Sequence, residues 1–393
     1  MKVYLDNGAT TKVADEVVRT ILPYFKKYYG NASSLHDFGV KAKEALENSR
    51  KIMAKELNAE PEEIIFTSGG SESDNLAIKG VVYANKKKGN HIITTKIEHP
   101  AVLAAFRELF LEGFKVTYLG VDKNGFINLN ELKKAITKDT ILVSVIHGNN
   151  EIGTLQDIEQ IGKLCKEKRV YFHTDAVQSF TKEKIDVKKM NIDLLSASGH
   201  KIHGPKGIGF LYIRKGINVK KIISGGKHEN NKRAGTENIP GIVGFAKAVQ
   251  LDKKLNQIKK LRDYMIKKIE KEIQDSKLNG DRNKRLVNNV NISFRYVEGE
   301  GLLMHLNDKG VAVSTGSACS SQSLEPSHVL TAIGLKHEDA HGSIRFTLSK
   351  YNTKEEIDYT LKELKTIVSR LREMSPWKKG IKFDFKEVCH HEH

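Results

Sequence analysis

The chain has 393 residues, 39% of them hydrophobic, and this length is more than one hydrophobic core usually supports. No run of 18 apolar residues occurs, which excludes a membrane-spanning helix. The N-terminal residues lack the layout of a secretory signal, and Cys165, Cys319 and Cys389 are too few and too scattered for a disulfide framework. We therefore expect a cytoplasmic protein of two domains.

The formal net charge is +17, which is compatible with a nucleic acid or an acidic protein as partner. The lysines are scattered over predicted helix faces, however, as in the pairs 253–254 and 259–260. No arginine-rich arm or recognisable nucleic-acid-binding motif is present. We expect a lysine-rich surface without direct nucleic-acid binding, and a non-catalytic basic scaffold or nucleic-acid-binding protein is the alternative of a different class.

Helices and strands are predicted to alternate from about residue 14 to residue 250. Apolar residues at helical spacing predict a helix over 41–57. Short apolar runs predict strands at 64–67, 92–95, 141–146, 170–173 and 209–213. Alternation of this kind favours an α/β fold, with a mostly parallel sheet covered by helices.

The pattern changes after about residue 250. One apolar stripe predicts a long helix over 255–273, short strands are predicted at 290–294 and 343–347, and a closing helix follows at 357–371. We expect a large domain at 14–255, a smaller α+β domain made of 1–13 and 256–375, and a flexible tail at 376–393.

Two segments far apart in the sequence carry residues typical of pyridoxal phosphate (PLP) chemistry. Lys201 lies in a turn rich in Ser, Gly and His, residues 198–204, and Asp175 follows the short strand predicted at 170–173. A lysine amine forms a Schiff base with PLP, and a carboxylate keeps the pyridine nitrogen protonated so that the ring accepts electrons. An Asp after a strand is commonly a helix cap, so the order and chemistry of both segments together favour PLP.

A site for the cofactor phosphate is predicted where a strand leads into a helix. In segment 67–72, backbone N–H groups at Gly70 and Ser71 would approach an anion at the helix N-terminus. An ordinary strand-to-helix turn with a Ser cap is the alternative. Ser198 and His200 would add side-chain donors to the same phosphate.

Three more side chains are candidates because of their neighbours. Gln178, three residues after Asp175, would reach the phenolic oxygen of PLP, and His99 could stack on the ring or lie in a surface turn. Cys319 lies among small polar residues in segment 314–321, a setting that suits an exposed, reactive thiol better than a buried structural cysteine.

Taken together, the segments resemble the NifS/IscS class of cysteine desulfurases, which are fold-type I PLP enzymes of the class-V aminotransferase family. The matching segments run in family order over nearly the whole chain, and those around Lys201 and Cys319 are highly specific. They are 4–11, 31–36, 68–75, 98–100, 149–153, the Asp175 and Lys201 segments, 233–236, the Cys319 loop with 324–328, and 343–346.

The resemblance implies the roles of the matching residues. The catalytic residues would be Lys201, which holds PLP and acts as acid and base, the nucleophile Cys319, and His99. The residues that bind the cofactor would be Gly70, Ser71, His99, Asn150, Asp175, Gln178, Ser198, His200, Lys201 and Thr236. The residues that bind the substrate would be Asn150, Arg345, Asn31 and His36, with Arg345 clamping the substrate carboxylate.

The implied activity converts L-cysteine to L-alanine and leaves a persulfide on Cys319, which supplies sulfur for iron–sulfur cluster assembly or tRNA thiolation. The acceptor would be an iron–sulfur scaffold or a sulfur-carrier protein, and no metal is expected in the site. Thr236 resembles a residue that reaches the phosphate of the other subunit, which implies a homodimer. The alternatives are a selenocysteine lyase or another PLP-dependent transferase, although a plain aminotransferase needs no nucleophilic thiol.

The sequence departs from the family pattern in several places, of which segment 227–233 is the main one. Lys227 stands where a third glycine is common, and segment 228–233 lacks an expected glycine. The family pattern therefore does not predict the backbone conformation of this segment, which would lie near the implied dimer interface. The tail segment 389–393 contains one cysteine and three histidines, a composition that could bind a metal, but a loosely held tail is the favoured interpretation.

Overall fold

A computed structural model describes residues 1–315 and 326–375. Its central feature is a seven-stranded sheet in the order β2-β8-β7-β6-β5-β3-β4. The five strands from β7 to β4 are parallel neighbours, whereas β8 runs antiparallel to both β7 and β2. The strands are β2 (Ile64–Thr67), β3 (His91–Thr95), β4 (Lys115–Leu119), β5 (Thr140–Ser144), β6 (Tyr171–Asp175), β7 (Leu194–Ser198) and β8 (Gly209–Ile213). The predicted α/β class with a mostly parallel sheet is confirmed.

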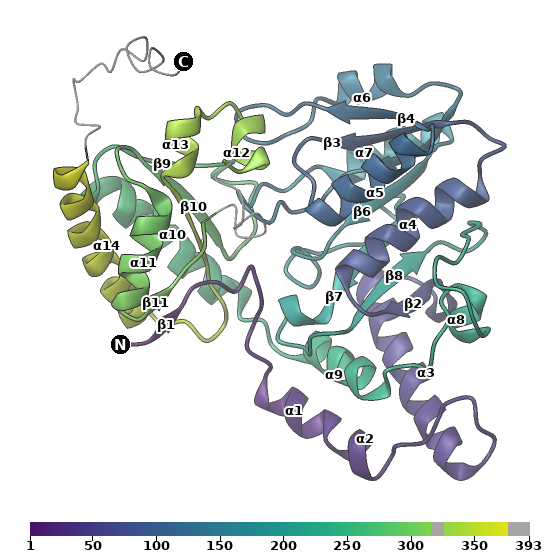
Figure 1. Ribbon diagram of the computed structural model, residues 1–393. Coiled ribbons are helices and arrows are strands. Elements are labelled where there is room, and N and C mark those ends of the chain that lie inside the picture. The colour runs from purple at the N-terminus through teal and green to yellow at the C-terminus, as the bar shows by residue number, and fades with distance from the viewer. Residues whose placement is uncertain (316–325, 376–393) are drawn as a thin grey trace, which may run out of the picture.

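Helices cover both faces of this sheet (Figure 1), which explains why its inner strands are buried over almost their whole length. Along β2, Ile65 faces the core under α4 and α5, whereas Ile64 and Phe66 face the core under α3, α7 and α9. The covering helices are α3 (Asp37–Leu57), α4 (Gly70–Ala84), α5 (Pro100–Leu111), α7 (Ile158–Lys168) and α9 (Ile239–Gln250). Shorter elements are α1 (Asp15–Ile21), α2 (Pro23–Lys26), η1 (Pro61–Glu63), α6 (Leu129–Ala135), η2 (Gly199–Lys201) and α8 (His228–Asn231).

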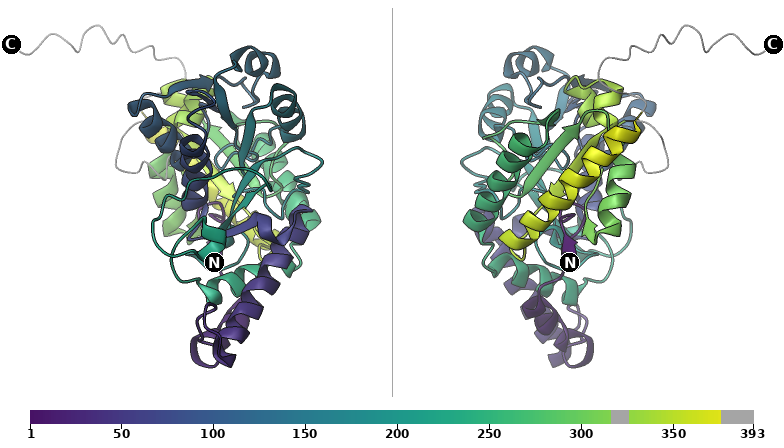
Figure 2. Two further views of the ribbon diagram at one scale, coloured as in Figure 1. Left: turned by 90° about the vertical axis from the view of Figure 1, so that its right-hand side faces the viewer. Right: turned by 90° about the vertical axis from the view of Figure 1, so that its left-hand side faces the viewer.

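A second, smaller sheet lies beside the first, with its own hydrophobic core. Its strands are antiparallel in the order β12-β10-β9, with β9 (Ser276–Leu278), β10 (Asn289–Phe294) and β12 (Ser343–Thr347). A short parallel pair joins β1 (Val3–Tyr4) to β11 (Val311–Ala312). The accompanying helices are α10 (Leu255–Glu272), α11 (Gly299–Asp308), α12 (His328–Ala332), α13 (His337–His341) and α14 (Lys354–Met374), and α14 lies along α10 and α11 (Figure 2).

The N-terminal segment connects the two sheets. It passes from β1 to β12, where Asn7 Nδ2 donates to the carbonyl of Thr347 (2.8 Å). A few residues later Thr11 N donates to the carbonyl of His200 (3.0 Å), beyond the end of β7 in the large sheet. Residues 7–11 therefore lie where the two sheets meet.

Some predicted element bounds differ from the observed ones. The strand predicted at 141–146 ends at Ser144, because the backbone N–H of Ile146 donates to Glu98 Oε1 (3.0 Å) instead of to a neighbouring strand. The helix predicted at 41–57 begins four residues earlier, at Asp37, since the His36 side chain caps it by accepting from Gly39 N. In the part of the chain that the structure describes, no helix is both long and apolar enough to cross a bilayer. The tail predicted at 376–393, with Cys389, lies outside the described residues.

Candidate active site

Lys201 lies at the carboxyl end of β7, in the single turn η2. Its Nζ donates to the backbone carbonyls of Gly8 (2.6 Å) and Ala9 (2.8 Å). Gln178 Nε2 donates to the same Gly8 carbonyl (2.9 Å), so the N-terminal segment brings the lysine and the glutamine together. His200 lies beside Lys201 and contacts Thr10 through Nδ1 (3.2 Å to Oγ1). Burial and the neighbouring lysines lower the pKa of His200 to about 4, so its imidazole is neutral near pH 7.

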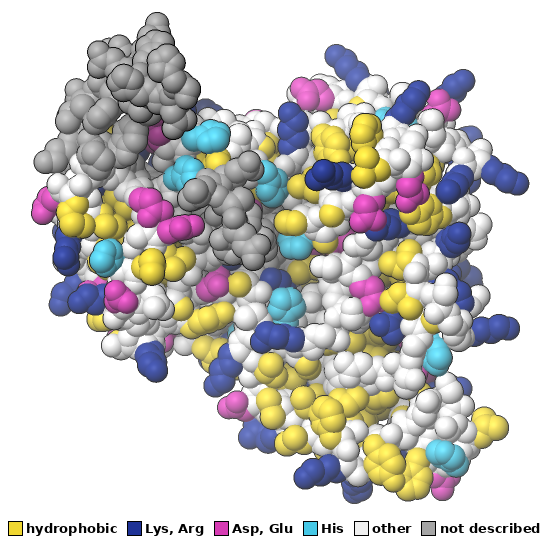
Figure 3. All heavy atoms as spheres, in the orientation of Figure 1, with side chains coloured by type: hydrophobic (Ala, Val, Ile, Leu, Met, Phe, Trp, Pro, Cys, Tyr) yellow, Lys and Arg dark blue, Asp and Glu magenta, His cyan; other side chains and the backbone are white. Residues whose placement is uncertain are grey.

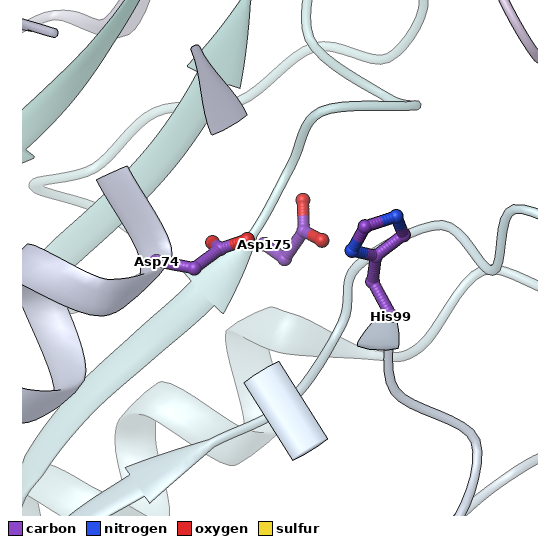
Figure 4. A group of neighbouring side chains, drawn as sticks. All are labelled: Asp74, His99 and Asp175. Atoms are coloured by element: carbon purple, nitrogen blue, oxygen red, sulfur yellow. The ribbon is translucent and has the colours of Figure 1, made fainter. Parts of the chain in front are cut away.

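Asp175 ends β6, the strand next to β7, and its side chain points toward His99 (Figure 4). His99 caps α5 by accepting from Ala101 N (3.2 Å). One ligand atom each from Asp74, His99 and Asp175 lies within 4.8 Å of the others. Burial raises the pKa of Asp175. His99 and the backbone N–H of Val177, which donates to Asp175 Oδ1 (2.8 Å), act in the opposite direction and lower this pKa. The buried carboxyl group of Asp175 thus lies beside the imidazole of His99, and burial lowers the pKa of this imidazole.

Gly70 and Ser71 form the first turn of α4, directly after β2. A Cβ at Gly70 would lie 2.7 Å from Val177 Cγ2, so glycine allows the helix start to approach the turn after Asp175. Ser198, which ends β7, is buried at the same edge of the sheet. The predicted phosphate ligands therefore converge at the carboxyl ends of the large sheet, where ligands of α/β folds bind.

Thr236 lies in the exposed loop after α8 and lines a cavity of about 100 Å³ together with Thr67, Ser68 and Arg233. Arg233 Nε pairs with Glu72 Oε1 (2.9 Å), and Glu72 also accepts from the backbone N–H of Ser68 (2.8 Å). This carboxylate thereby ties the loop of Thr236 to the start of α4.

Arg345 and Asn150 form a second group at the junction of the two sheets. The buried guanidinium donates to the carbonyl of Asn150 (2.9 Å) and to Asp6 Oδ1 (3.1 Å). Among the described residues, neither Arg345 Nε nor Asn150 Oδ1 has a hydrogen-bond partner, although both atoms are buried. A carboxylate is the ligand that an arginine with an unpaired N–H prefers, and a substrate ammonium or hydroxyl group could donate to the asparagine oxygen.

Asn31 and His36 do not join the residues around Lys201 in this chain. They belong to the connection between α2 and α3, which projects from the lower end of the molecule, whereas β7 lies in the central sheet (Figure 1). Asn31 Oδ1 accepts from Ser33 N (2.8 Å), and His36 caps α3.

Cys319 lies outside the described residues, but both flanks of its segment are described. Ser314 exchanges two backbone hydrogen bonds with Arg345 (3.2 and 2.7 Å). On the other side, the Ser327 hydroxyl donates to the buried carboxylate of Glu151, next to Asn150. The segment that carries Cys319 is therefore attached at both ends beside Arg345 and Asn150.

Several buried ionisable groups of the site were not predicted. Burial raises the pKa of Glu98 to about 8 and that of Glu151 to about 7, while it lowers the pKa of Lys182 to about 7. Lys182 Nζ donates to the carbonyl of Gln178 (2.7 Å), and Asp74 lies beside Asp175. Glu98, Glu151 and Asp74 fall within the matching segments, but only the folded arrangement shows that their side chains are buried at the site.

These residues fit PLP. An amine that could hold the cofactor, Lys201, and a buried carboxyl group that could face the ring nitrogen, Asp175, lie at the ends of adjacent strands, and the start of α4 lies beside the turn after Asp175. The unpaired buried atoms of Arg345 and Asn150 add positions for a bound amino acid. The fold and the site together define a PLP-dependent enzyme that acts on an amino acid.

Comparison with known proteins identifies the family. Residues 3–360 match the model of the family "Aminotransferase class-V". The chain is 53% identical to "Cysteine desulfurase IscS" of Dictyoglomus turgidum, over 98% of this chain and 99% of the relative. It is 55% identical to "Cysteine desulfurase IscS" of Clostridium botulinum strain Hall, over 95% and 96%.

Two solved structures are similar as well. A "NIFS-LIKE PROTEIN" superposes with a TM-score of 0.88 at 39% identity, covering 94% of this chain and all of that one. A structure of "SspA in complex with cysteine" has a TM-score of 0.81 at 38% identity, covering 90% and 100%. The chain belongs to the class-V aminotransferase family. Within this family it is a PLP-dependent cysteine desulfurase.

Proposed function

We propose that the protein converts L-cysteine to L-alanine, leaves a persulfide on Cys319, and supplies this sulfur for iron–sulfur cluster assembly. The observation that carries the proposal is the position of Arg345 and Asn150. Each has a buried polar atom that is unpaired among the described residues, and both adjoin the attachment points of the Cys319 segment. A cysteine whose carboxylate lies at Arg345 would thus be close to the ends of the segment that carries the nucleophile.

The resemblance implies the roles of the residues around Lys201, and their positions support these roles. Bound PLP supplies an electron sink for the carbanion at the substrate α-carbon. Lys201 would hold the cofactor through Nζ and move the α-proton, Asp175 would keep a proton on the ring nitrogen, and His99 would lie beside the ring. Gly70, Ser71, Ser198 and His200 would bind the phosphate, and Gln178 would donate to the phenolic oxygen. The convergence of these residues at one edge of the sheet supports the assignments.

The sulfur step uses the thiolate of Cys319. The thiolate attacks the substrate sulfur, a sulfur–sulfur bond forms, and the carbon–sulfur bond of cysteine breaks. The electron pair of that bond remains on the substrate carbon, which takes up a proton, so that alanine leaves and Cys319 carries the second sulfur as a persulfide. No external oxidant is required.

Replacing Cys319 by serine tests this step. Because serine has no thiol, Cys319→Ser should lose at least about a thousandfold in alanine formation while the visible absorbance of bound PLP and its response to L-cysteine persist. Cys165→Ser is the matched control, because Cys165 is buried in α7, and it should retain activity. Full alanine formation by Cys319→Ser would contradict the proposed role.

A protein acceptor for the persulfide, such as an iron–sulfur scaffold or a sulfur carrier, is part of the proposal. The segment 324–328 after Cys319 resembles the class that hands sulfur to proteins. The same persulfide would serve tRNA thiolation, so transfer of labelled sulfur to purified candidate acceptors distinguishes the two destinations.

The protein is further proposed to act as a homodimer. The end of the molecule around α2 and the start of α3 exposes many apolar side chains, seen in yellow at the bottom of Figure 3. They include Leu22, Phe25, Tyr29, Leu35, Phe38 and Val40. Such a patch supports a protein–protein interface, and a second copy that contacts this end would receive Asn31 and His36 near its active site. The resemblance implies that Thr236 reaches the phosphate of the other subunit.

A further inference from the structure

Asp74 is a buried carboxyl group to which neither the sequence pattern nor the proposed function assigns a role. Its side chain leaves α4 toward β6 and lies beside Asp175, on the side away from His99 (Figure 4). Asp74 is 1% exposed, and its Oδ1 has no hydrogen-bond partner among the described residues. The carboxylates of Asp74 and Asp175 approach within 4.8 Å.

The charged groups that surround Asp74 do not compensate a negative charge there. Asp175 on β6 and Glu98 after β3 are acids. His173 on β6 lies 3.7 Å from Asp74 Oδ1, but burial lowers its pKa to about 3, so it is neutral. Burial raises the pKa of Asp74 well above its usual value, and the nearby charge of Asp175 raises it further. Of the causes that act on this pKa, only the hydrogen bond of the Ser196 hydroxyl on β7 lowers it.

Asp175 is in a better position to carry a negative charge. It accepts the backbone N–H of Val177 (2.8 Å), and His99 and Lys201 both favour its ionised form. Two carboxylates this close in a buried site do not both ionise, and the one with more donors and positive neighbours keeps the charge. Their environments therefore assign the proton to Asp74 and the charge to Asp175.

We propose that Asp74 is a positioning residue that is held as a neutral carboxylic acid, so that Asp175 carries the single negative charge that faces the ring nitrogen of PLP. The neutrality of Asp74 stands on its own surroundings. Its consequence for the ring rests on the proposed role of Asp175.

Infrared spectroscopy of the purified protein tests the neutrality of Asp74. The difference spectrum between the wild type and Asp74→Asn at neutral pH should contain the C=O band of one protonated carboxyl group. Asp358→Asn is the control, because Asp358 pairs with Lys354 (2.6 Å), which lowers the pKa of this carboxyl group, and the change should remove no such band. A difference spectrum of Asp74→Asn that shows only the loss of an ionised carboxylate would overturn the proposal.

Thermal stability gives a second readout that does not depend on activity. A carboxyl group with a raised pKa in the native state binds its proton more tightly there than in the unfolded chain, so the native state loses stability as pH rises above the unfolded pKa. Asparagine does not titrate. The melting temperature of Asp74→Asn should therefore exceed that of the wild type by about 2 °C or more at pH 8, and the difference should shrink toward pH 4. The measured quantity is the melting temperature of Asp74→Asn minus that of the wild type. A smaller difference at pH 8 than at pH 4 would contradict a neutral Asp74.

The visible spectrum of bound PLP separates the two parts of the proposal. If neutral Asp74 leaves the charge to Asp175, Asp74→Asn should keep the wild-type pH profile of this spectrum, whereas Asp175→Asn should change it. An altered profile in Asp74→Asn, despite the infrared band in the wild type, would refute the consequence for Asp175. An unchanged profile in Asp175→Asn would refute the proposed role of Asp175 and leave the protonation of Asp74 established.

Discussion

At the scale of single residues, the guanidinium of Arg345 is buried between two acceptors, Asp6 and the carbonyl of Asn150, that fix its orientation. The remaining Nε is unpaired among the residues that the structure describes. A planar guanidinium can hold these two acceptors and still present an N–H to a substrate carboxylate, whereas an ammonium group is a single point charge. The position thus demands arginine for its geometry as well as its charge.

Arg345→Lys should therefore raise the KM for L-cysteine about tenfold or more, with a smaller fall in kcat, because a charge-assisted hydrogen bond is lost. Steady-state alanine formation measures both constants. Arg214→Lys, at a partly exposed arginine paired with Asp193, is the control and should leave KM unchanged. A KM for Arg345→Lys within twofold of the wild type would show that the substrate carboxylate binds elsewhere.

At the scale of elements, segment 228–233 lacks the expected glycine, yet part of its backbone is left-handed. Glu229, Asn230 and Asn231 all have positive φ values, 47°, 55° and 61°. The buried pair between Glu229 and Arg50, with two contacts of 2.8 Å, holds this segment against α3, and Glu229 also accepts from the N–H of Phe66 (2.7 Å). Asparagine tolerates the left-handed region better than most residues, and the ion pair fixes the turn.

Asn231→Gly should raise the free energy of unfolding by about 0.5 kcal/mol, since glycine adopts positive φ without strain. Asn48→Gly is a matched control in the interior of α3, where the same change should lower it by about 0.4 kcal/mol because glycine is the poorer helix former. Denaturant unfolding followed by circular dichroism measures both. If both substitutions raised the free energy of unfolding, or both lowered it, the explanation from backbone conformation would be contradicted.

At the scale of the whole molecule, the single chain leaves two predicted substrate residues, Asn31 and His36, at a projecting end with an exposed apolar surface. Leu35, between them, is 97% exposed. Burying such a surface against a second copy would remove apolar area from water and place both residues near another Lys201.

Leu35→Asp should therefore weaken the dimer and reduce alanine formation, because a charge would enter the apolar interface. Light scattering after size-exclusion chromatography measures the mass, and the assay is run at the same protein concentrations. Met304→Asp on α11, where the methionine is 67% exposed, is the control and should change neither. A wild-type protein that elutes as a monomer would contradict the proposed assembly.

Much of the fold could be predicted because its information is local. Apolar runs marked the strands that end at Thr67, Thr95 and Ile213. The antiparallel placement of β8 between β2 and β7 could not be predicted, because strand pairing depends on contacts between distant residues. In the site, Lys201 and Asp175 were predicted from chemistry and order, whereas the burial of Asp74 and Glu151 depends on which helix and loop pack over them.

The sequence by itself determined the family and the α/β class, and it predicted the groups proposed to bind PLP, because residue type and order along the chain carry this information. Only the tertiary structure decided which ionisable groups share a buried environment. It placed the side chain of Asp74 beside that of Asp175, and among the described residues it left Arg345 Nε and Asn150 Oδ1 without partners. The physical reason is that protonation and hydrogen-bond satisfaction depend on distance and solvent exclusion, which arise only when separate segments pack together.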